Sequence, residues 1–135
     1  MKAYIATSLT NATEHNELRD LLAARGVGLT YDWTAHGSVW REGRERIAQV
    51  AEREASGVAA ADLLIAILPG GRGTHVEIGI AIAFRIPVVV VPQSTADYEG
   101  PETCAFYHHS GVTIASTRSF HRIADSVRLA IEIAR

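Results

Sequence analysis

The sequence predicts an α/β fold in which a doubly wound, five-stranded parallel sheet carries helices on both faces. Two apolar runs, at residues 63–68 and 87–92, are typical of central parallel strands that are covered on both sides. Segments with apolar residues at helical spacing alternate with strand-like segments along the chain. The length of 135 residues, with 47% apolar and 21% charged residues, suits one globular domain, which we place at residues 1–135.

The first half of the chain is expected to alternate strands and helices. Asn11 is the expected N-cap of the first helix, with Glu14 as its capping-box partner and Gly26 as its stop. Gly57 is expected to bend or divide the second helix. In order, the segments are a strand at 2–7, a helix at 11–25, a strand at 27–32, a loop at 33–41 that carries both tryptophans, and a helix at about 42–61.

The second half of the chain continues the same alternation. Right-handed crossovers between five such strands favour the flavodoxin-like strand order 2-1-3-4-5. Ligands of such sheets bind beyond the carboxyl ends of strands 1 and 3, where two loops rich in Gly, Ser and Thr, at 7–11 and 69–74, are expected to meet. In order, the segments are a strand at 63–68, a glycine-rich loop at 70–73, a helix at about 74–85, a strand at 87–92, a long polar connection at 93–110, a strand at 111–115 and a helix at 119–134.

Composition and charge argue against several classes of protein. The net charge is −2, with 13 Lys and Arg against 15 Asp and Glu, and no basic cluster suited to a nucleic acid polymer is visible. No apolar run approaches the roughly 20 residues that span a membrane. Because Cys104 is the single cysteine and no secretory leader is recognisable, we expect a reducing, cytoplasmic setting. Neither an HExxH motif nor paired Cys/His spacing is present, so we expect no metal and no cofactor.

The stretch from Asp62 to Ala83 carries the strongest functional signal. Its glycines let backbone amides approach a ligand closely, and a helix that starts near Thr74 directs free N–H groups toward an anion. Glu77 then lies in the first helical turn, where the helix dipole favours the charged carboxylate that a nucleophile needs. Acidic residues also occur in first turns for helix stability alone, so the residues by themselves leave both interpretations open.

This stretch resembles the nucleoside 2-deoxyribosyltransferase family, including its 2′-deoxynucleoside 5′-monophosphate N-glycosidase relatives. The similar run is AADLLIAILPGGRGTHVEIGIAIAFRIPVVVV, residues 60–91. The shared pattern is an Ala-Asp pair, an apolar strand, a loop that contains glycine, the motif Glu-aliphatic-Gly-x-Ala and a further strand. The motif is Glu77-Ile78-Gly79-Ile80-Ala81 in this chain. In the order of its elements, the resemblance extends over nearly the whole chain, as a single nucleoside 2-deoxyribosyltransferase-like domain.

The resemblance implies cleavage of the N-glycosidic bond of a (deoxy)nucleoside or a nucleoside 5′-monophosphate, by hydrolysis or by base transfer. Glu77 falls at the position of the family's nucleophilic glutamate, and Tyr4 at that of a tyrosine that hydrogen-bonds it. Glu54 falls at the position of an acid that protonates the leaving base. The loop that contains Thr7, Ser8 and Thr10 falls where nucleotide hydrolases bind a 5′-phosphate. Family relatives assemble as dimers or larger, so we expect a homodimer or higher homo-oligomer, with a contact in segment 93–110.

Three positions depart from the family pattern. Glu54 replaces an Asp, so the acid is one methylene longer. Thr10 lies where the nucleotide-cleaving relatives carry an Arg, and Gly71 lies where the transferases have a further Asp near a sugar hydroxyl. Arg72, in the glycine-rich loop with Gly71 and Gly73, is the expected source of the missing positive charge.

Several residues keep two interpretations. Tyr4 is either a partner of Glu77 or a packed strand residue, and Glu54 is either the acid of a two-carboxylate glycosidase mechanism or a helix-surface glutamate. Trp33, with Trp40 as the weaker candidate, either stacks on a nucleobase or covers the core. Minor polar candidates near them are Asp32 and His36. Two other functions stay open: a nucleotide-binding sensor module without turnover, and an NAD glycohydrolase.

Overall fold

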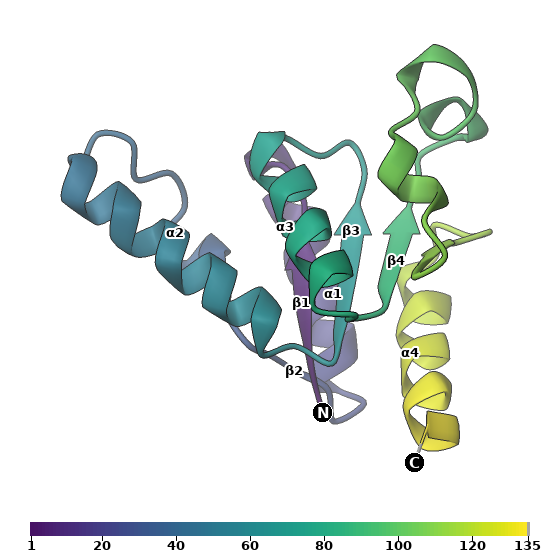
Figure 1. Ribbon diagram of the computed structural model, residues 1–135. Helices are drawn as coiled ribbons and strands as arrows, with labels where there is room; N and C mark the ends of the chain where they lie inside the picture. The colour runs from purple at the N-terminus through teal and green to yellow at the C-terminus, as the bar shows by residue number, and fades with distance from the viewer. Residues whose placement is uncertain (135) are drawn as a thin grey trace.

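The computed structural model describes the backbone of residues 1–134 and the side chains of residues 1–128. Within these residues, five parallel strands form one sheet in the order β2-β1-β3-β4-β5, which confirms the predicted doubly wound topology (Figure 1). The second strand is shorter than predicted and pairs at the sheet edge over two positions. The strands are β1 (Lys2–Ala6), β2 (Gly28–Leu29), β3 (Leu63–Ile67), β4 (Val88–Val91) and β5 (Val112–Ile114).

Helices cover both faces of the sheet, as predicted. One face carries α1 (Ala12–Ala23) and α4 (Phe120–Ala134), and the other carries α2 (Arg44–Ala59) and α3 (Arg72–Ala83). Because successive side chains of a strand point to opposite faces, β1 supplies both cores. Tyr4 and Ala6 pack under α2 and α3, while Ala3 and Ile5 pack under α1 and α4. The N-terminal half of α2 leans away from the sheet (Figure 1), and its largely exposed residues agree with this.

The third helix begins two residues earlier than predicted, at Arg72. Thr74 causes this early start, because its Oγ1 accepts a hydrogen bond of 3.0 Å from the N–H of Gly71 and so caps the helix from within. Gly70 leaves room for the Thr74 side chain, since a Cβ at that position would lie 2.6 Å from Thr74 Cγ2. Glu77 therefore lies in the second turn of α3, and its predicted place in the first turn is wrong.

Asn11 does not cap the first helix as predicted. A short 3-10 helix, η1 (Leu9–Asn11), leads into α1, and the Asn11 side chain makes no capping hydrogen bond. Its Nδ2 instead donates to Thr7 Oγ1 and to the carbonyl oxygen of Pro69, both at 3.0 Å. The Asn11 amide therefore joins the loop after β1 to the loop after β3 and does not stabilise the helix start.

Gly57 neither bends nor divides the second helix, since α2 is continuous from Arg44 to Ala59. The glycine permits a close approach instead, because a Cβ there would lie 2.9 Å from Tyr31 Cβ and 3.3 Å from the ring of Tyr4. Its role is therefore to let α2 pack directly on two tyrosines. No helix within residues 1–134 is both long enough and apolar enough to cross a membrane.

Candidate active site

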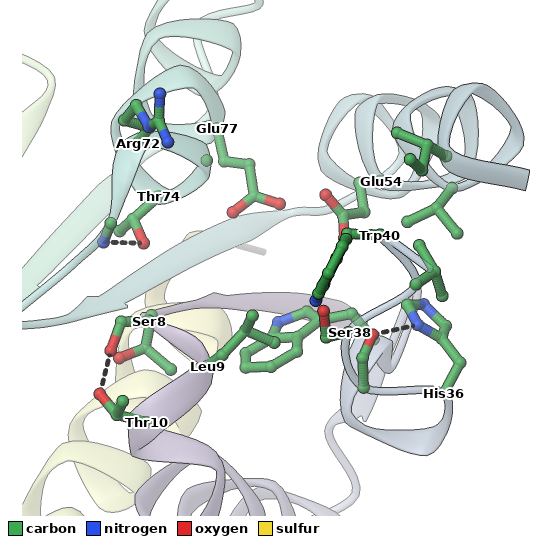
Figure 2. Close-up of a pocket in the computed structure, with 18 residues that line it drawn as sticks. Ser8, Leu9, Thr10, His36, Ser38, Trp40, Glu54, Arg72, Thr74 and Glu77 are labelled. Atoms are coloured by element: carbon green, nitrogen blue, oxygen red, sulfur yellow. Dashed lines mark hydrogen bonds between the residues drawn. The ribbon is translucent and has the colours of Figure 1, made fainter. Parts of the chain in front are cut away.

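A cavity of about 600 Å³ opens between α2 and α3 at the carboxyl ends of β1 and β3 (Figure 2). It lies where the sequence predicts the two loops to meet, and Asn11 joins these loops by its hydrogen bonds. The volume falls within the range of pockets that hold small molecules, roughly 300–1,000 Å³. The walls come from four segments: residues 7–10 after β1, residues 33 and 36–40 between β2 and α2, the inner face of α2 at Ile47, Val50 and Glu54, and the start of α3 at residues 71–74 and 77.

Glu77 is buried at 6% exposure and still lines the cavity, into which Figure 2 shows its carboxyl group pointing. Burial raises the pKa of this carboxyl from 4.5 to about 8; the hydrogen bond from Tyr4 opposes the rise, and the charge of Glu54 adds to it. The prediction that the helix dipole keeps Glu77 ionised is therefore wrong for the unliganded protein. The carboxyl lies beyond the first helical turn, and loss of its hydration outweighs the dipole.

Tyr4 lies beneath the cavity, fully buried, and its hydroxyl donates a hydrogen bond to Oε2 of Glu77. Burial and the neighbouring Glu77 carboxyl both raise the pKa of the Tyr4 phenol, so it remains a protonated donor at neutral pH. One carboxyl oxygen of Glu77 is thus engaged by the protein. Oε1 is the oxygen left for a ligand.

Glu54 faces Glu77 across the cavity, projecting from α2 (Figure 2). The side chain is half-buried beside Val50, and burial raises its pKa, while the charge of His36 opposes the rise. A raised pKa is the property expected of a general acid. The structure therefore brings two carboxyl groups with raised pKa values to one cavity. Among the described residues, no group of three or more His, Cys, Asp or Glu side chains could hold a metal ion.

The hydroxyls of the loop after β1 divide into two kinds. Thr7 is buried, and its Oγ1 donates to the carbonyl of Ile67 at 2.7 Å while it accepts from Asn11, so this hydroxyl holds the loop in place. Ser8 and Thr10 hydrogen-bond each other at 2.6 Å on the cavity wall (Figure 2). Of the three predicted binding residues in this loop, Ser8 and Thr10 present hydroxyls to a ligand.

The start of α3 supplies backbone amides and one cation at the same end of the cavity. The first N–H groups of a helix lack partners within it, and residues 71–74 lie in the cavity wall. Arg72 is exposed and makes no ion pair with a described side chain. Figure 2 shows Arg72 above this end of the cavity and Ser8 and Thr10 below it. Amides, hydroxyls and a guanidinium suit an anionic group there.

The two tryptophans have different surroundings. Trp33 is 5% exposed, its Nε1 donates to the carbonyl of Ile5 at 3.0 Å, and its ring meets that of His15 edge-on, so it belongs to the core although its edge also lines the cavity. Trp40 is 67% exposed at the cavity wall, and the guanidinium of Arg41 lies 4.7 Å from its ring centroid. Both tryptophans line the cavity, and Trp40 is the more exposed of the two.

We expect this difference to appear in stability. Trp33→Ala should lower the free energy of unfolding by about 3–5 kcal/mol, because it empties a buried site and removes a hydrogen-bond donor. Trp40→Ala should change it by less than about 0.5 kcal/mol, because the indole is largely exposed. Urea unfolding followed by circular dichroism measures both values. Equal losses in the two variants would contradict the assignment of Trp33 to the core.

The minor candidates also separate. Asp32 does not line the cavity; its carboxylate accepts from the N–H of Thr34 at 3.0 Å and from Arg19 at 2.9 Å, which is a structural role. His36 lines the cavity, with its Nε2 bonded to the hydroxyl of Tyr31 at 2.6 Å and its Nδ1 to the carbonyl of Gly37 at 2.7 Å.

Sequence reasoning missed two apolar residues of the wall. Leu9 and Ile47 are exposed hydrophobic side chains that line this cavity together with Trp40, the weaker of the two tryptophan candidates. Their joint position suits the flat apolar face of a ligand. The signal in the sequence is weak, because Leu9 lies between Ser8 and Thr10, and Ile47 lies in a largely charged stretch.

Comparisons with known proteins agree with the fold and confirm the family that the sequence resembles. A family model described as nucleoside 2-deoxyribosyltransferase matches residues 3–124. A solved structure of the CMP N-glycosidase BcmB from Clostridium botulinum is similar in fold, with a TM-score of 0.64 and 17% sequence identity over 94% of this chain and 98% of that chain. Comparison with the curated proteins gives no match.

Proposed function

The chain belongs to the nucleoside 2-deoxyribosyltransferase family, and from this premise we propose that it cleaves the N-glycosidic bond of a nucleoside 5′-monophosphate with Glu77 as the nucleophile. Family membership makes it an enzyme of the glycosidase or transferase class that acts on nucleosides or nucleotides. The observation that carries the finer proposal is the pair of carboxyl groups, Glu77 held by Tyr4 and Glu54 opposite, in one cavity that could hold a sugar.

The mechanism follows from the position of these groups. As the bond between C1′ and the base nitrogen breaks, positive charge develops at C1′, and Oε1 of Glu77 attacks it to form a glycosyl ester. Glu54 gives its proton to the departing base, so the base leaves as a neutral molecule. Glu54, now ionised, then takes a proton from water or from an acceptor base that attacks C1′. The ester breaks and Glu77 is released as a carboxylate, still hydrogen-bonded by Tyr4.

The two carboxyl groups are expected to work with one proton between them. Burial raises both pKa values, so a doubly ionised pair forms only toward alkaline pH. In the active form Glu77 is ionised and Glu54 protonated. Because Glu77 has a pKa of about 8, this arrangement is a minor one in the free protein and is favoured as positive charge develops at C1′.

We therefore expect kcat/KM to depend on pH as a bell. It should fall above about pH 8, where the pair loses its last proton, and fall again in acid, where Glu77 cannot ionise. In Glu54→Gln the alkaline limb should disappear, and the reduced activity should rise with pH until Glu77 is fully ionised. Initial rates of base release from pH 5 to 10 measure both profiles. An unchanged alkaline limb in Glu54→Gln would remove Glu54 from the acid role.

The end of the cavity between the loop after β1 and the start of α3 is suited to a 5′-phosphate. Ser8, Thr10 and Arg72 surround it together with the amides at the start of α3. Trp40 lies beside Glu54 (Figure 2), and Ile47 and Val50 of α2 line the same cavity, which favours the α2 side for the base. With Arg72 in place, the loss of the family's Arg at Thr10 does not leave this end without a cation.

Arg72→Ala should raise KM for the 5′-monophosphate by about 10- to 100-fold, since it removes a charge-assisted contact to phosphate. KM for the matching nucleoside should stay as in the wild type. Arg53→Ala is the control, because Arg53 is an exposed arginine on α2 that does not line the cavity. Binding of nucleotide and nucleoside by Arg72→Ala as in the wild type would dispose of the phosphate contact.

The function itself is tested with a panel of nucleosides, 2′-deoxynucleosides and their 5′-monophosphates, scored by chromatography for released base. Release with and without an acceptor base separates transfer from hydrolysis. NAD is included, and nicotinamide release would assign a different substrate. Nucleotide-dependent thermal stabilisation without release of any base would overturn the proposal in favour of a binding module.

We also propose that the protein is a homodimer or higher homo-oligomer. Val76 on α3 and Phe84 directly after its last residue are 62% and 64% exposed, and Phe106, in the predicted contact segment 93–110, is 56% exposed. Large exposed apolar side chains of this kind are typical of association surfaces. Sedimentation velocity should give at least twice the chain mass, and Phe84→Glu should reduce it. A wild-type monomer would contradict the proposal.

A further inference from the structure

His75 makes two hydrogen bonds that the proposed mechanism does not use. It lies on α3 near the helix start, half-buried and outside the cavity wall. Its Nδ1 is 2.8 Å from the carbonyl oxygen of Gly71, and its Nε2 is 2.7 Å from the hydroxyl of Tyr107. Tyr107 belongs to a short 3-10 helix, η5 (Ala105–His108), in the connection from β4 to β5. The imidazole therefore links the start of α3 to a segment more than 30 residues away.

The partners fix which nitrogen carries the proton. A carbonyl oxygen only accepts, so Nδ1 of His75 must be the donor to Gly71. In the neutral ring Nε2 is then an acceptor, and the Tyr107 hydroxyl donates to it. Tyr107 is buried at 5% exposure, and burial raises the pKa of its phenol, so the hydroxyl stays a donor. The Gly71 carbonyl thus fixes the imidazole tautomer, and the Tyr107 hydroxyl supports the ring by donating to Nε2.

The carbonyl of Gly71 belongs to the same peptide unit as the N–H of Arg72. In a planar trans peptide these two groups point in opposite directions. Holding the Gly71 oxygen toward His75 therefore fixes the Arg72 N–H in the opposite direction, and residues 71–74 line the cavity. The N–H of Gly71 is held separately by Thr74 Oγ1 at 3.0 Å.

The Gly71–Arg72 peptide needs a side-chain restraint because two glycines precede Arg72. Gly70 and Gly71 have no Cβ to restrict rotation, so an unrestrained Gly71–Arg72 peptide would sample other orientations at little cost. The His75 backbone N–H also reaches the Gly71 oxygen, but at 3.4 Å, near the limit of a hydrogen bond. The imidazole at 2.8 Å is the stronger restraint.

We propose that His75 is a positioning residue that aims the Arg72 N–H at the phosphate end of the cavity, and that Tyr107 supports it by holding the imidazole in place through its hydrogen bond to Nε2. This inference deepens the proposed function and rests on it for the identity of the anion. It assigns a binding role to a link between α3 and the connection from β4 to β5.

Three substitutions of His75 separate its two hydrogen bonds. Asn places an amide donor near the position of Nδ1 and keeps the bond to Gly71, Gln reaches toward Tyr107 instead, and Ala removes both. His75→Ala and His75→Gln should raise KM for the 5′-monophosphate about tenfold, with kcat within about threefold of the wild type. His75→Asn should restore KM, and Tyr107→Phe should raise it about threefold. The matching nucleoside should show none of these changes. Equal losses for nucleoside and nucleotide, or no rescue by Asn, would overturn the positioning role.

Nuclear magnetic resonance tests the same role without turnover. In protein labelled with 15N at histidine, the His75 ring should carry a proton on Nδ1, and Tyr107→Phe should move the Nε2 signal because that nitrogen loses its hydrogen bond. Titration with inorganic phosphate should move the backbone amide signal of Arg72 in the wild type and much less in His75→Ala. If these results hold while no base is released, the positioning role stands and the proposed function fails. A His75 ring protonated at Nε2 in the wild type, or an equal Arg72 response in His75→Ala, would overturn the positioning role whether or not base is released.

Discussion

Glu77→Gln is expected to lower the rate of base release by roughly 10³-fold or more, because a neutral amide cannot form the glycosyl ester that divides the reaction into two steps. The substitution keeps the size of the side chain, and the amide oxygen can still accept the hydrogen bond from Tyr4. A loss of rate would therefore report lost chemistry rather than lost structure. Single-turnover release of base from the best substrate of the panel measures the effect.

Two further variants make this result interpretable. Glu17→Gln changes an exposed glutamate on α1 to the same amide and should leave the rate unchanged. Tyr4→Phe removes the hydrogen bond to Glu77 but not the nucleophile, so it should cost about tenfold. A rate in Glu77→Gln within tenfold of the wild type would contradict the nucleophile assignment.

The same substitution should make the protein more stable at alkaline pH. Glu77 has a folded-state pKa of about 8 against 4.5 for the free side chain, so between these values the folded protein holds a proton that the unfolded chain has released. The free energy of unfolding of the wild type therefore falls across this window and is constant on either side of it. The full difference corresponds to about 5 kcal/mol for this one group. Gln does not ionise, so the free energy of unfolding of Glu77→Gln does not fall across this window.

Urea unfolding of the wild type and Glu77→Gln at pH 4.5, 6 and 8.5 measures this effect. The difference in unfolding free energy between the two proteins cancels the contributions of titrating groups that do not interact with Glu77, and it should grow by several kcal/mol in favour of the variant. Glu17→Gln, compared with the wild type in the same way, should show a difference that does not change with pH. A constant difference for Glu77→Gln as well would show that the carboxyl is not held in a dehydrated site.

The sheet could be predicted from the sequence because its signals are local. The apolar runs that became β3 and β4 need cover on both faces, and that need alone implies a parallel sheet between helix layers. The meeting of the loops after β1 and β3 follows from the same topology. The family resemblance then paired Tyr4 with Glu77, and the hydrogen bond between them agrees with that pairing.

Other features of the site depend on contacts that the sequence does not display. The raised pKa of Glu77 comes from burial by distant segments, whereas the helix position alone favours the charged form. Trp33 and Trp40 lie in one loop, and only the fold shows that Trp33 reaches the core beside β1 while Trp40 stays exposed. The early start of α3 depends on the hydrogen bond between Thr74 Oγ1 and the N–H of Gly71. From the sequence alone, Gly71 is assigned to a glycine-rich loop before the helix.

The most direct test of the account is whether a sugar becomes bonded to Glu77. A substrate analogue with fluorine at C2′ slows both steps through the electron-withdrawing effect of fluorine on charge at C1′, so the glycosyl ester should accumulate. Mass spectrometry of the quenched protein should show the mass of one fluorinated sugar phosphate per chain, on the peptide that contains Glu77, and no such adduct in Glu77→Gln. Steady release of base from the analogue with no adduct, or an adduct on another residue, would contradict the central claim.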